Sequence, residues 1–312
     1  MQDVKTNHLE LFYDCVDESN NVLYEAFHKD YFELIEMTVK NILAGEILTD
    51  TDEETTLKLQ TIYDRLADID FQVEEVRKAM QAIILKGLKE MRLQNGATTP
   101  DTLGIFTAYL ITKLSDRSDL KILDPLCGTG NLLHTVADHL DKNLTLFACD
   151  LDPMMTKLTS LVSDLLNLRV EIFLQDSLTL AMRDLDFIIF DMPNTTSEST
   201  YFPYQAILHY KAMLRPNGAI IGIVGNDFFD HDDDQSFKKA LLEDCSIIGL
   251  VELPDAMFVS KPKTIVVISK EKRDKKNCFM VKLPSFTDVK DFNESLLRIE
   301  AWFEKNYRSE EK

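Results

Sequence analysis

The chain has 312 residues, of which 45% are hydrophobic and 28% are charged, so it can bury a large core as one large or two modest domains. No stretch reaches the roughly 18 consecutive apolar residues of a membrane span, and the amino terminus has no signal-peptide pattern, so we expect a cytoplasmic protein without a membrane partner. A formal net charge of −19 excludes an overall basic surface for binding nucleic-acid phosphates, although a local basic face is compatible with it. Five scattered cysteines without Cys-x-x-Cys spacing favour reduced thiols over a disulfide framework or a zinc site, and no metal is expected.

Apolar residues recur at helical spacing from about residue 20 to about residue 92, and acidic turns separate the segments. Asn95 and Gly96 then offer a helix C-cap. This pattern predicts an N-terminal helical domain over residues 1–95.

A further helix and a sheet are predicted next. Thr99 suits the N-cap and Pro100 the first position of a helix that runs through Leu114. Beyond residue 119, short apolar runs alternate with amphipathic helical stretches, which predicts parallel strands joined by crossover helices in an α/β fold. The seven expected strands are 121–123, 144–149, 170–174, 185–190, 219–224, 246–253 and 264–269, followed by an added strand at 278–283 and a C-terminal helix around 292–303.

The segment KILDPLCGTGNLL, residues 121–133, runs from a predicted strand through a glycine-rich turn into a predicted helix. Gly128 and Gly130 permit close backbone approach and positive φ, and the helix N-terminus offers free N–H groups to a ligand. Leu133 stands where a dinucleotide-binding turn has its third glycine, and no Gly-Lys-Ser/Thr is present, so dinucleotide and nucleoside triphosphate sites are excluded. A purely structural turn is the alternative, because every doubly wound fold needs one here.

Carboxylates follow the next two predicted strands. Asp150 comes about 20 residues after the turn, where a carboxylate accepts hydrogen bonds from a ribose diol. Asp176 follows the third strand, where it can bind an adenine amino group. Together with the turn, these carboxylates favour a site for a nucleoside-containing cofactor.

Seven segments between residues 95 and 272 read TTPDTLG, LDPLCGTGNLL, CDLDP, QDSL, DMPN, LRPNGAIIGIVGNDFF and IIGLVELPDAMFVSKPKTIVVISK. In this order they resemble the motifs of bacterial N6-adenine DNA methyltransferases, above all the small YtxK-like group related to type I modification subunits. The resemblance implies a class I methyltransferase fold, a Rossmann-like seven-stranded domain over residues 96–283, with a C-terminal helix or tail over 284–312. It also implies S-adenosyl-L-methionine (S-adenosylmethionine) as the cofactor.

The resemblance further implies a set of cofactor-binding residues. They are Thr98, Thr99, Pro100, Asp124, Cys127, Gly128, Thr129, Gly130, Asn131, Asp150, Leu151, Asp176 and Ser177. Residues within 124–131 surround the methionine moiety, Asp150 binds the ribose and Asp176 binds the adenine. For residues 98–100 a plain helix start is a strong alternative.

The catalytic loop of the family reads Asp-Pro-Pro-aromatic, and in this chain it reads Asp191, Met192, Pro193 and Asn194. In such loops a side-chain acceptor and the next backbone carbonyl accept both N–H bonds of the target amine, and they stabilise the positive charge that develops on its nitrogen. Asp191 and the Met192 carbonyl retain these acceptors, whereas Asn194 lacks the aromatic face that stacks on a flipped base. We therefore predict that the polar chemistry is intact and that the base clamp is displaced or lost.

Aromatic residues after this loop are candidates for substrate binding. Tyr201, Phe202 or Tyr204 could fold over the site, although anchoring of the next helix is the slightly better interpretation of each. Phe228 and Phe229 could form a wall of the substrate pocket, and the alternative for this pair is the buried core.

The first functional hypothesis is an S-adenosylmethionine-dependent N-methyltransferase of the adenine-specific DNA type. The second is a catalytically weak or inactive cofactor-binding interaction protein, and the third is methyl transfer to RNA or to protein. Only about 40 residues follow Lys270, too few for a separate module that reads DNA bases. The N-terminal helical domain or a partner would then supply recognition, with a homodimer as one such assembly, or recognition would be weak.

Overall fold

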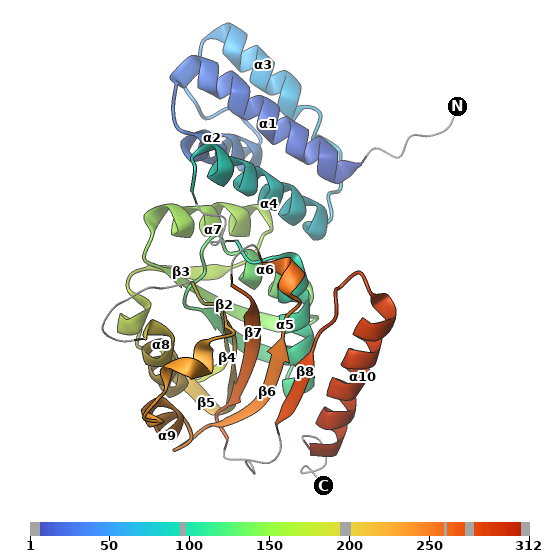
Figure 1. Cartoon of the computed structure of the whole chain (residues 1–312). Coiled ribbons are helices and arrows are strands. Elements are labelled where there is room, and N and C mark those ends of the chain that lie inside the picture. Colours follow the sequence, from blue (N-terminus) through green and yellow to red (C-terminus); the bar gives the residue numbers. More distant parts are fainter. Residues whose placement is uncertain (1–6, 94–97, 194–200, 259–260, 272–277, 307–312) are drawn as a thin grey trace.

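The N-terminal region is helical, as predicted. The computed structural model describes residues 7–93, 98–193, 201–258, 261–271 and 278–306. The first four helices are α1 (His8–Phe27), α2 (Tyr31–Ala44), α3 (Glu53–Tyr63) and α4 (Val73–Glu90) (Figure 1). The apolar periodicity continues across residues 27–31, but the helix breaks there, because His28 adopts a φ of 50° and the Asp30 carboxylate caps α2. The predicted cap at residues 95–96 lies outside the described residues.

An eight-stranded sheet forms the centre of the rest of the chain. Its strands are β1 (Asp119–Asp124), β2 (Asn143–Asp150), β3 (Val170–Leu174), β4 (Leu185–Asp191), β5 (Leu214–Gly225), β6 (Ser246–Glu252), β7 (Lys263–Ser269) and β8 (Phe279–Lys282). They lie in the order β3-β2-β1-β4-β5-β7-β6-β8. The predicted α/β fold is confirmed, but the sheet has eight strands rather than seven, because the added C-terminal strand pairs with β6.

The direction of β7 differs from the prediction of parallel strands. β7 pairs antiparallel with both β5 and β6. The link between Glu252 and Lys263 is shorter than the crossover of a dozen or more residues that parallel neighbours require. As a result, Lys263 at the start of β7 pairs with Gly225 at the end of β5. A lysine is thereby brought to the edge at which the parallel strands end.

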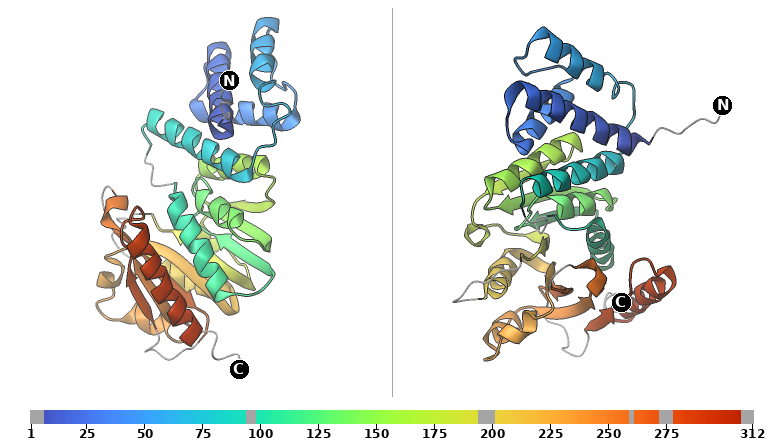
Figure 2. Two further views of the ribbon diagram at one scale, coloured as in Figure 1. Left: turned by 90° about the vertical axis from the view of Figure 1, so that its right-hand side faces the viewer. Right: turned by 45° about the horizontal axis from the view of Figure 1, so that its top comes forward.

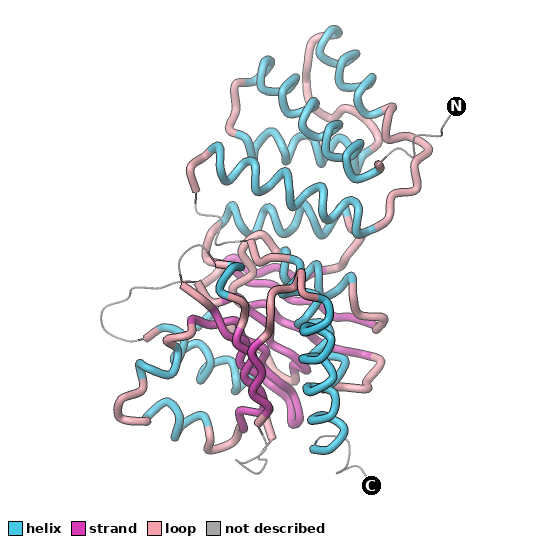
Figure 3. The backbone as a smooth tube through the Cα atoms, turned by 45° about the vertical axis from the view of Figure 1, so that its right-hand side comes forward, coloured by secondary structure: helices cyan, strands magenta, loops and turns pink. Residues whose placement is uncertain are grey.

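Helices cover both faces of the sheet (Figure 3). The apolar core of one face includes residues of α5 (Asp101–Leu114), α6 (Asn131–Asp138) and α10 (Val289–Asn306), and that of the other face includes residues of α8 (Phe202–Tyr210) and α9 (Ser236–Leu241). Short 3₁₀ turns are formed by η2 (Ser177–Thr179), η3 (Lys211–Met213), η4 (Phe228–His231) and η5 (Asp255–Met257). The C-terminal helix α10, seen against the sheet in the left view of Figure 2, buries Ile299 and Phe303 in the core.

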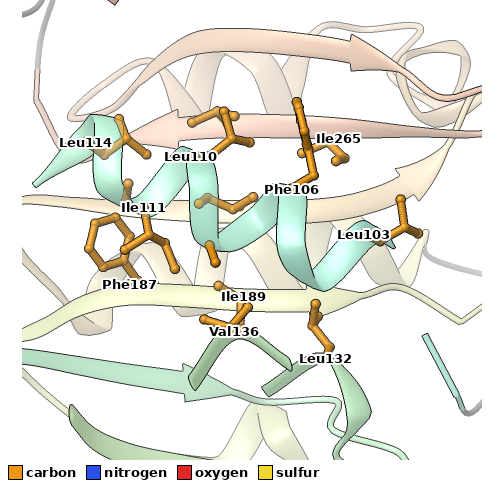
Figure 4. Packing of buried hydrophobic residues seen from close by; sticks show 14 of the residues in the cluster. Leu103, Phe106, Leu110, Ile111, Leu114, Leu132, Val136, Phe187, Ile189 and Ile265 are labelled. Atoms are coloured by element: carbon orange, nitrogen blue, oxygen red, sulfur yellow. The ribbon is translucent and has the colours of Figure 1, made fainter. Parts of the chain in front are cut away.

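Helix α5 is the central helix of the first face. Its apolar side lies over Phe187 and Ile189 of β4 and Ile265 of β7 (Figure 4). Gly104 permits close packing on α6, since a Cβ atom at this position would lie 2.6 Å from the Cβ atom of Thr135. The start of α5 is thus held at a fixed place beside the turn that precedes α6.

The helical domain packs on α7 (Pro153–Leu165). Apolar residues of α1, α2 and α4 form one buried cluster with α7, including Leu158 and Val162. Figures 1 and 2 show this domain at the end of the molecule beside α7. Since α7 also contacts β2 and β3, the helical domain is attached to the part of the sheet that carries the glycine-rich turn.

Arg77 of α4 forms polar contacts between the helical domain and the helices that cover the sheet. Its side chain is only 1% exposed and donates to Asp101 at 2.8 Å, to the Thr135 hydroxyl at 3.0 Å and to Asp138 at 3.2 Å. These partners belong to α5 and α6. The helical domain therefore has a direct ionic connection to the sheet-covering helices.

All five cysteines lie in the described part of the chain, where each is a free thiol and four are buried. Within the same described ranges, none of the helices combines the length and apolar character that a membrane crossing demands. The described residues also contain no cluster of His, Cys, Asp and Glu suited to a metal ion.

Candidate active site

A cavity of about 660 Å³ opens at the edge of the sheet where β1 to β4 end. Ligands of open α/β sheets bind at this edge, and small-molecule sites have volumes of about 300–1,000 Å³. Most of the residues that line the cavity were predicted from the sequence as site residues. The lining consists of Thr99, Pro125, Leu126, Cys127, Gly128, Asp150, Leu151, Asp152, Met155, Asp176, Ser177, Leu178, Asp191, Pro193, Phe202 and Lys263.

The glycine-rich turn forms one wall of this cavity. Gly128 and Gly130 adopt φ values of 52° and 79°, as their positions in the sequence predict. A Cβ atom at Gly130 would lie 2.6 Å from the His134 ring, so the turn also packs closely on the His134 side chain. The Cys127 thiol lies at the wall, where burial raises its pKa and keeps it protonated. Thr129, Gly130 and Asn131 lie behind this wall, outside the lining.

Asp150 stands at the end of β2, inside the cavity. Its carboxylate accepts the N–H groups of Gly128 at 2.8 Å and of Asp152 at 2.9 Å. Each carboxylate oxygen has a second lone pair, so two hydroxyl groups of a ligand can still donate to Asp150. The next residue, Leu151, is 72% exposed and offers an apolar face at the same wall.

Asp176 and Ser177 follow β3 on the neighbouring side of the cavity. Asp176 accepts the Leu178 N–H at 2.9 Å and so fixes the short turn η2. The Ser177 hydroxyl pairs at 2.6 Å with the buried Tyr210 hydroxyl, which holds the loop to α8. The cavity wall thus places carboxylates at the ends of two adjacent strands, where a nucleoside can bind between them.

Asp124 lies at the end of β1 beneath the floor of the cavity, where it is only 1% exposed. Its carboxylate accepts the Leu126 N–H at 3.1 Å. Burial, together with the charges of Asp150 and Asp191, raises the pKa of Asp124 well above its usual range. Asp124 therefore supports the turn from below rather than facing the cavity.

Asp191 ends β4 and has only 12% of its side chain exposed. One carboxylate oxygen accepts the Thr99 hydroxyl at 3.1 Å, and the other forms an ion pair with Lys263 Nζ at 2.5 Å. The same Nζ atom lies 3.2 Å from the Met192 carbonyl oxygen. Burial raises the pKa of Asp191, while the Lys263 charge and hydrogen bond and the Thr99 hydroxyl act in the opposite direction. Asp191 and the Met192 carbonyl thus both accept from one nitrogen.

The Thr-Pro segment has a more specific role than a helix start. Helix α5 begins at Asp101, one residue later than predicted, with Pro100 at the N-cap position and without a side-chain cap. The Thr99 hydroxyl donates to Asp191 instead. Thr98 pairs with Thr129 at 3.1 Å, and so the segment joins the glycine-rich turn to the end of β4.

The predicted substrate-binding aromatics occupy different environments. Phe202 lines the cavity beside the exposed Pro193, whereas Asn194 lies outside the described residues. Tyr204 stacks on Phe237 at 3.9 Å in the core, and Phe228 is 1% exposed in the same cluster. Tyr201 stacks on His231 at 3.9 Å, and Phe229 remains 43% exposed.

Lys263 is the main site residue that the sequence did not single out. It lies within the last resembling segment, but nothing in that pattern assigns it a role. The short link between β6 and β7 could have identified Lys263. A link of this length requires an antiparallel β7, which places the first residue of that strand at the cavity edge. Asp152, Met155 and Leu126 also line the cavity without having been predicted.

A family model for N-6 DNA methylases matches residues 97–306, two-thirds of the chain. The chain belongs to the N-6 DNA methylase family. A second model, for the YtxK N-terminal helical domain, matches residues 10–88. The predicted resemblance to N6-adenine DNA methyltransferases and to the YtxK-like group is therefore confirmed.

Individual relatives match over most of this chain. Protein YtxK of Bacillus subtilis strain 168 is 28% identical, and the alignment covers 97% of this chain and 99% of YtxK. A crystal structure from Listeria monocytogenes, described as a class I S-adenosylmethionine-dependent methyltransferase, is 27% identical with a TM-score of 0.84, over 95% of this chain and 99% of that one. A type I restriction-modification methyltransferase subunit from Streptococcus thermophilus shares the fold at 14% identity and a TM-score of 0.62, over 93% of this chain and 74% of that one.

This N-6 DNA methylase family member is an S-adenosylmethionine-dependent methyltransferase. The residues of the cavity fit that cofactor. Asp150 has free acceptor capacity for the ribose hydroxyls, and Leu151 offers an apolar surface to a flat ring. Asp176 follows the adjacent strand, where its carboxylate would be available to an adenine amino group, and Gly128 leaves the turn open to close approach.

Asp150→Ala is expected to weaken S-adenosylmethionine binding by about 10- to 150-fold, because hydrogen bonds to a charged group contribute about 1.5–3 kcal/mol. Titration calorimetry on the purified chain measures the dissociation constant. Glu171→Ala is the matched control, since Glu171 is an exposed carboxylate on the neighbouring strand β3 and should leave the constant unchanged. Equal constants for Asp150→Ala and the wild type would exclude a ribose contact by Asp150.

Proposed function

We propose that this chain transfers the methyl group of S-adenosylmethionine to the exocyclic N6 atom of adenine in DNA. A single observation carries the proposal. One nitrogen atom, Lys263 Nζ, lies within hydrogen-bond distance of both Asp191 and the Met192 carbonyl. An amino nitrogen at the same point could donate to both acceptors, in the cavity that also holds Asp150 and Asp176.

The chemistry requires such a pair of acceptors. The lone pair of an adenine amino group is delocalised into the ring, and so the free amine is a weak nucleophile. Asp191 and the Met192 carbonyl would each accept one N–H bond, which turns the lone pair out of the ring plane and stabilises the charge that develops on nitrogen. S-adenosylmethionine supplies the electrophilic methyl group when it is bound. Thr99 holds the second oxygen of Asp191 and so fixes the direction of the carboxylate.

We assign the stacking role to Phe202 rather than to Tyr204 or Phe228. Phe202 lines the same cavity as Pro193, and its side chain is half-buried. Tyr204 donates from its hydroxyl to the Phe228 carbonyl and is packed on Phe237, so neither Tyr204 nor Phe228 can reach a base without unpacking the core. The proposed clamp is thus an aromatic residue displaced along the chain from the Asn194 position.

The target DNA would be recognised by segments of the chain outside the sheet or by a partner. We propose that residues 1–95, a helical domain, act with residues 96–283, the methyltransferase domain, and with the C-terminal segment 284–312. The helical domain, a protein partner or a second copy of the chain in a homodimer would supply contacts to DNA. A cytoplasmic location belongs to the same proposal, since chromosomal DNA would be the substrate.

Transfer of a labelled methyl group from S-adenosylmethionine tests the proposed substrate. The purified chain is added to a lysate of cells that lack its gene, and portions are then treated with DNase, RNase or protease. We expect label that only DNase removes and that the Asp191→Ala variant does not produce. Label that RNase or protease removes would instead identify RNA or protein as the substrate, and label equal to that of the variant would favour a non-catalytic binding protein.

A further inference from the structure

Lys263 is a largely buried lysine in the described part of the chain, and its environment is not that of a surface residue. It begins β7, pairs with Gly225 of β5 and has only 12% of its side chain exposed. Lys261, two residues earlier, is 65% exposed and pairs with Asp227 at 3.1 Å. The two lysines therefore differ in environment although they are close in sequence.

The partners of Lys263 are the two groups that the proposed chemistry assigns to the target amine. Its Nζ atom lies 2.5 Å from an Asp191 carboxylate oxygen and 3.2 Å from the Met192 carbonyl oxygen. An ammonium group has three N–H bonds and an adenine amino group has two, so either donor can satisfy both acceptors. The amine position of the active site is consequently filled by an amine of the chain itself.

Two nitrogen atoms cannot occupy this one point, although each acceptor oxygen has a second lone pair. The second Asp191 oxygen already accepts the Thr99 hydroxyl, and the Met192 side chain is only 2% exposed, so the acceptors cannot easily turn away. Leaving Asp191 with the Thr99 hydroxyl but without a cation would also be costly, because a largely buried charge needs a charged partner. A target nitrogen can donate to both acceptors from this point only when the Lys263 ammonium leaves it, and the target then takes over its hydrogen bonds.

We propose that Lys263 is an internal occupant of the target-amine position and that an adenine binds by exchange with it. This inference rests on the proposed function, because it takes Asp191 and Met192 as the acceptors of the target amine. Exchange makes Lys263 a specificity-determining residue. A base that lacks an amino group cannot replace the two hydrogen bonds that Lys263 gives up, and so it is rejected.

Chemical labelling of lysines tests the exchange without relying on methyl transfer. The full-length chain is treated briefly with acetic anhydride, and mass spectrometry gives the labelled fraction of Lys263 and, as the matched control, of Lys261. We expect slow labelling of Lys263 in the wild type. In Asp191→Ala it should be faster by roughly tenfold or more, the factor that corresponds to losing one hydrogen bond to a charged group. Lys261 should label at the same rate in both proteins.

A second arm adds a single-stranded oligonucleotide that contains adenine, with S-adenosylhomocysteine present, and a matched oligonucleotide with unsubstituted purine in place of adenine. Labelling of Lys263 should rise with the adenine oligonucleotide and not with the purine one. Equal labelling in Asp191→Ala and the wild type, or no rise with adenine, would overturn the proposal. Failure of the proposed function is seen separately, as absence of methyl transfer to the adenine oligonucleotide, whereas transfer without a rise in labelling contradicts only the exchange.

Discussion

Asp191→Ala is expected to lower the rate of methyl transfer by about 100- to 1,000-fold, the usual effect of removing one group that stabilises developing charge. The cofactor dissociation constant should change little, because the residues expected to bind the cofactor, Asp150 at the end of β2 and Asp176 after β3, lie elsewhere in the cavity. Asp191 accepts from both the Thr99 hydroxyl and the Lys263 ammonium, so the substitution removes the acceptor that we propose for the target amine. Steady-state kinetics at saturating cofactor, with calorimetric titration of S-adenosylmethionine, separates the two effects. Unchanged turnover in the variant would remove Asp191 from the mechanism.

The pH profile adds an independent test of the same residue. A carboxyl group accepts two hydrogen bonds at full strength only when it is ionised. Burial raises the pKa of Asp191, in spite of the opposing Lys263 charge, so protonation begins at a higher pH than the ordinary value of about 3.9. Transfer by the wild type should therefore fall as the pH is lowered through this raised pKa.

Asp191→Asn is the matched variant for the pH profile, because the amide keeps one acceptor oxygen and the shape of the side chain but does not titrate. Its residual kcat/KM should lose the acid limb that Asp191 causes. A limb at the same pH in the variant would assign the titration to another buried acid, for which Asp124 with its raised pKa is the candidate. The prediction that Asp191 causes the fall in activity at low pH would then be wrong.

Three of the four carboxylates of the cavity could be predicted because each directly follows an apolar run or is separated from it by one residue, whereas Asp152 was not predicted. Asp150 ends β2, Asp191 ends β4 and Asp176 follows β3 after a single residue, and the ends of parallel strands meet at one edge of a sheet. Local sequence is sufficient for such residues, since the direction of the strand determines where the next side chain lies. The same logic failed for β7, because an apolar run does not indicate its direction, and Lys263 was missed as a consequence.

The aromatic residues show a second limit. Phe202 and Tyr204 are two positions apart at the start of α8, which turns by about 100° per residue, so they point in nearly opposite directions. One ring therefore lines the cavity and the other is buried in the core. A choice between them requires the rotation of the helix about its axis, and the surrounding core sets that rotation.

Arg77 shows a third limit, because its partners are distant in sequence. In an amphipathic helix with many charged residues, an arginine is expected on the solvent-exposed face. Here Arg77 is buried and bonds to Asp101 and Asp138, which are 24 and 61 positions further along the chain. The packing of α4 and α5 on α6 brings the three together, and no short-range pattern reports such packing.

The Arg77 contacts continue into the active site through a chain of hydrogen bonds. Asp101 accepts from Asn131 at 2.9 Å, and the same Asn131 nitrogen lies 2.7 Å from the Thr99 carbonyl oxygen. The Thr99 hydroxyl then donates to Asp191. Burial raises the pKa of Asp101, but the hydrogen bond from Asn131 and the hydrogen bond and charge of Arg77 outweigh it and hold the pKa below its usual value. The network thus holds the Thr-Pro segment against the glycine-rich turn.

Arg77→Met is expected to destabilise the protein by about 3–5 kcal/mol, because it leaves two largely buried carboxylates without their cation. The matched control is Arg65→Met, which removes an arginine of the same domain whose pair with Glu18 is 36% and 48% exposed, and which should cost less than about 1 kcal/mol. Urea denaturation followed by circular dichroism gives both free energies of unfolding. A loss for Arg77→Met no larger than for the control would show that Asp101 and Asp138 find other partners.

The same variant should also weaken the cofactor site at temperatures at which it remains folded. Without Arg77, Asp101 is held only through Asn131, and the Thr99 segment loses its anchor on the helical domain. We expect S-adenosylmethionine to bind more weakly to Arg77→Met and unchanged to Arg65→Met, as measured by calorimetry at low temperature. Destabilisation with an unchanged cofactor dissociation constant would limit Arg77 to a structural role. Weaker binding in Arg77→Met alone would mean that the helical domain, although outside the cavity, controls the geometry of the active site.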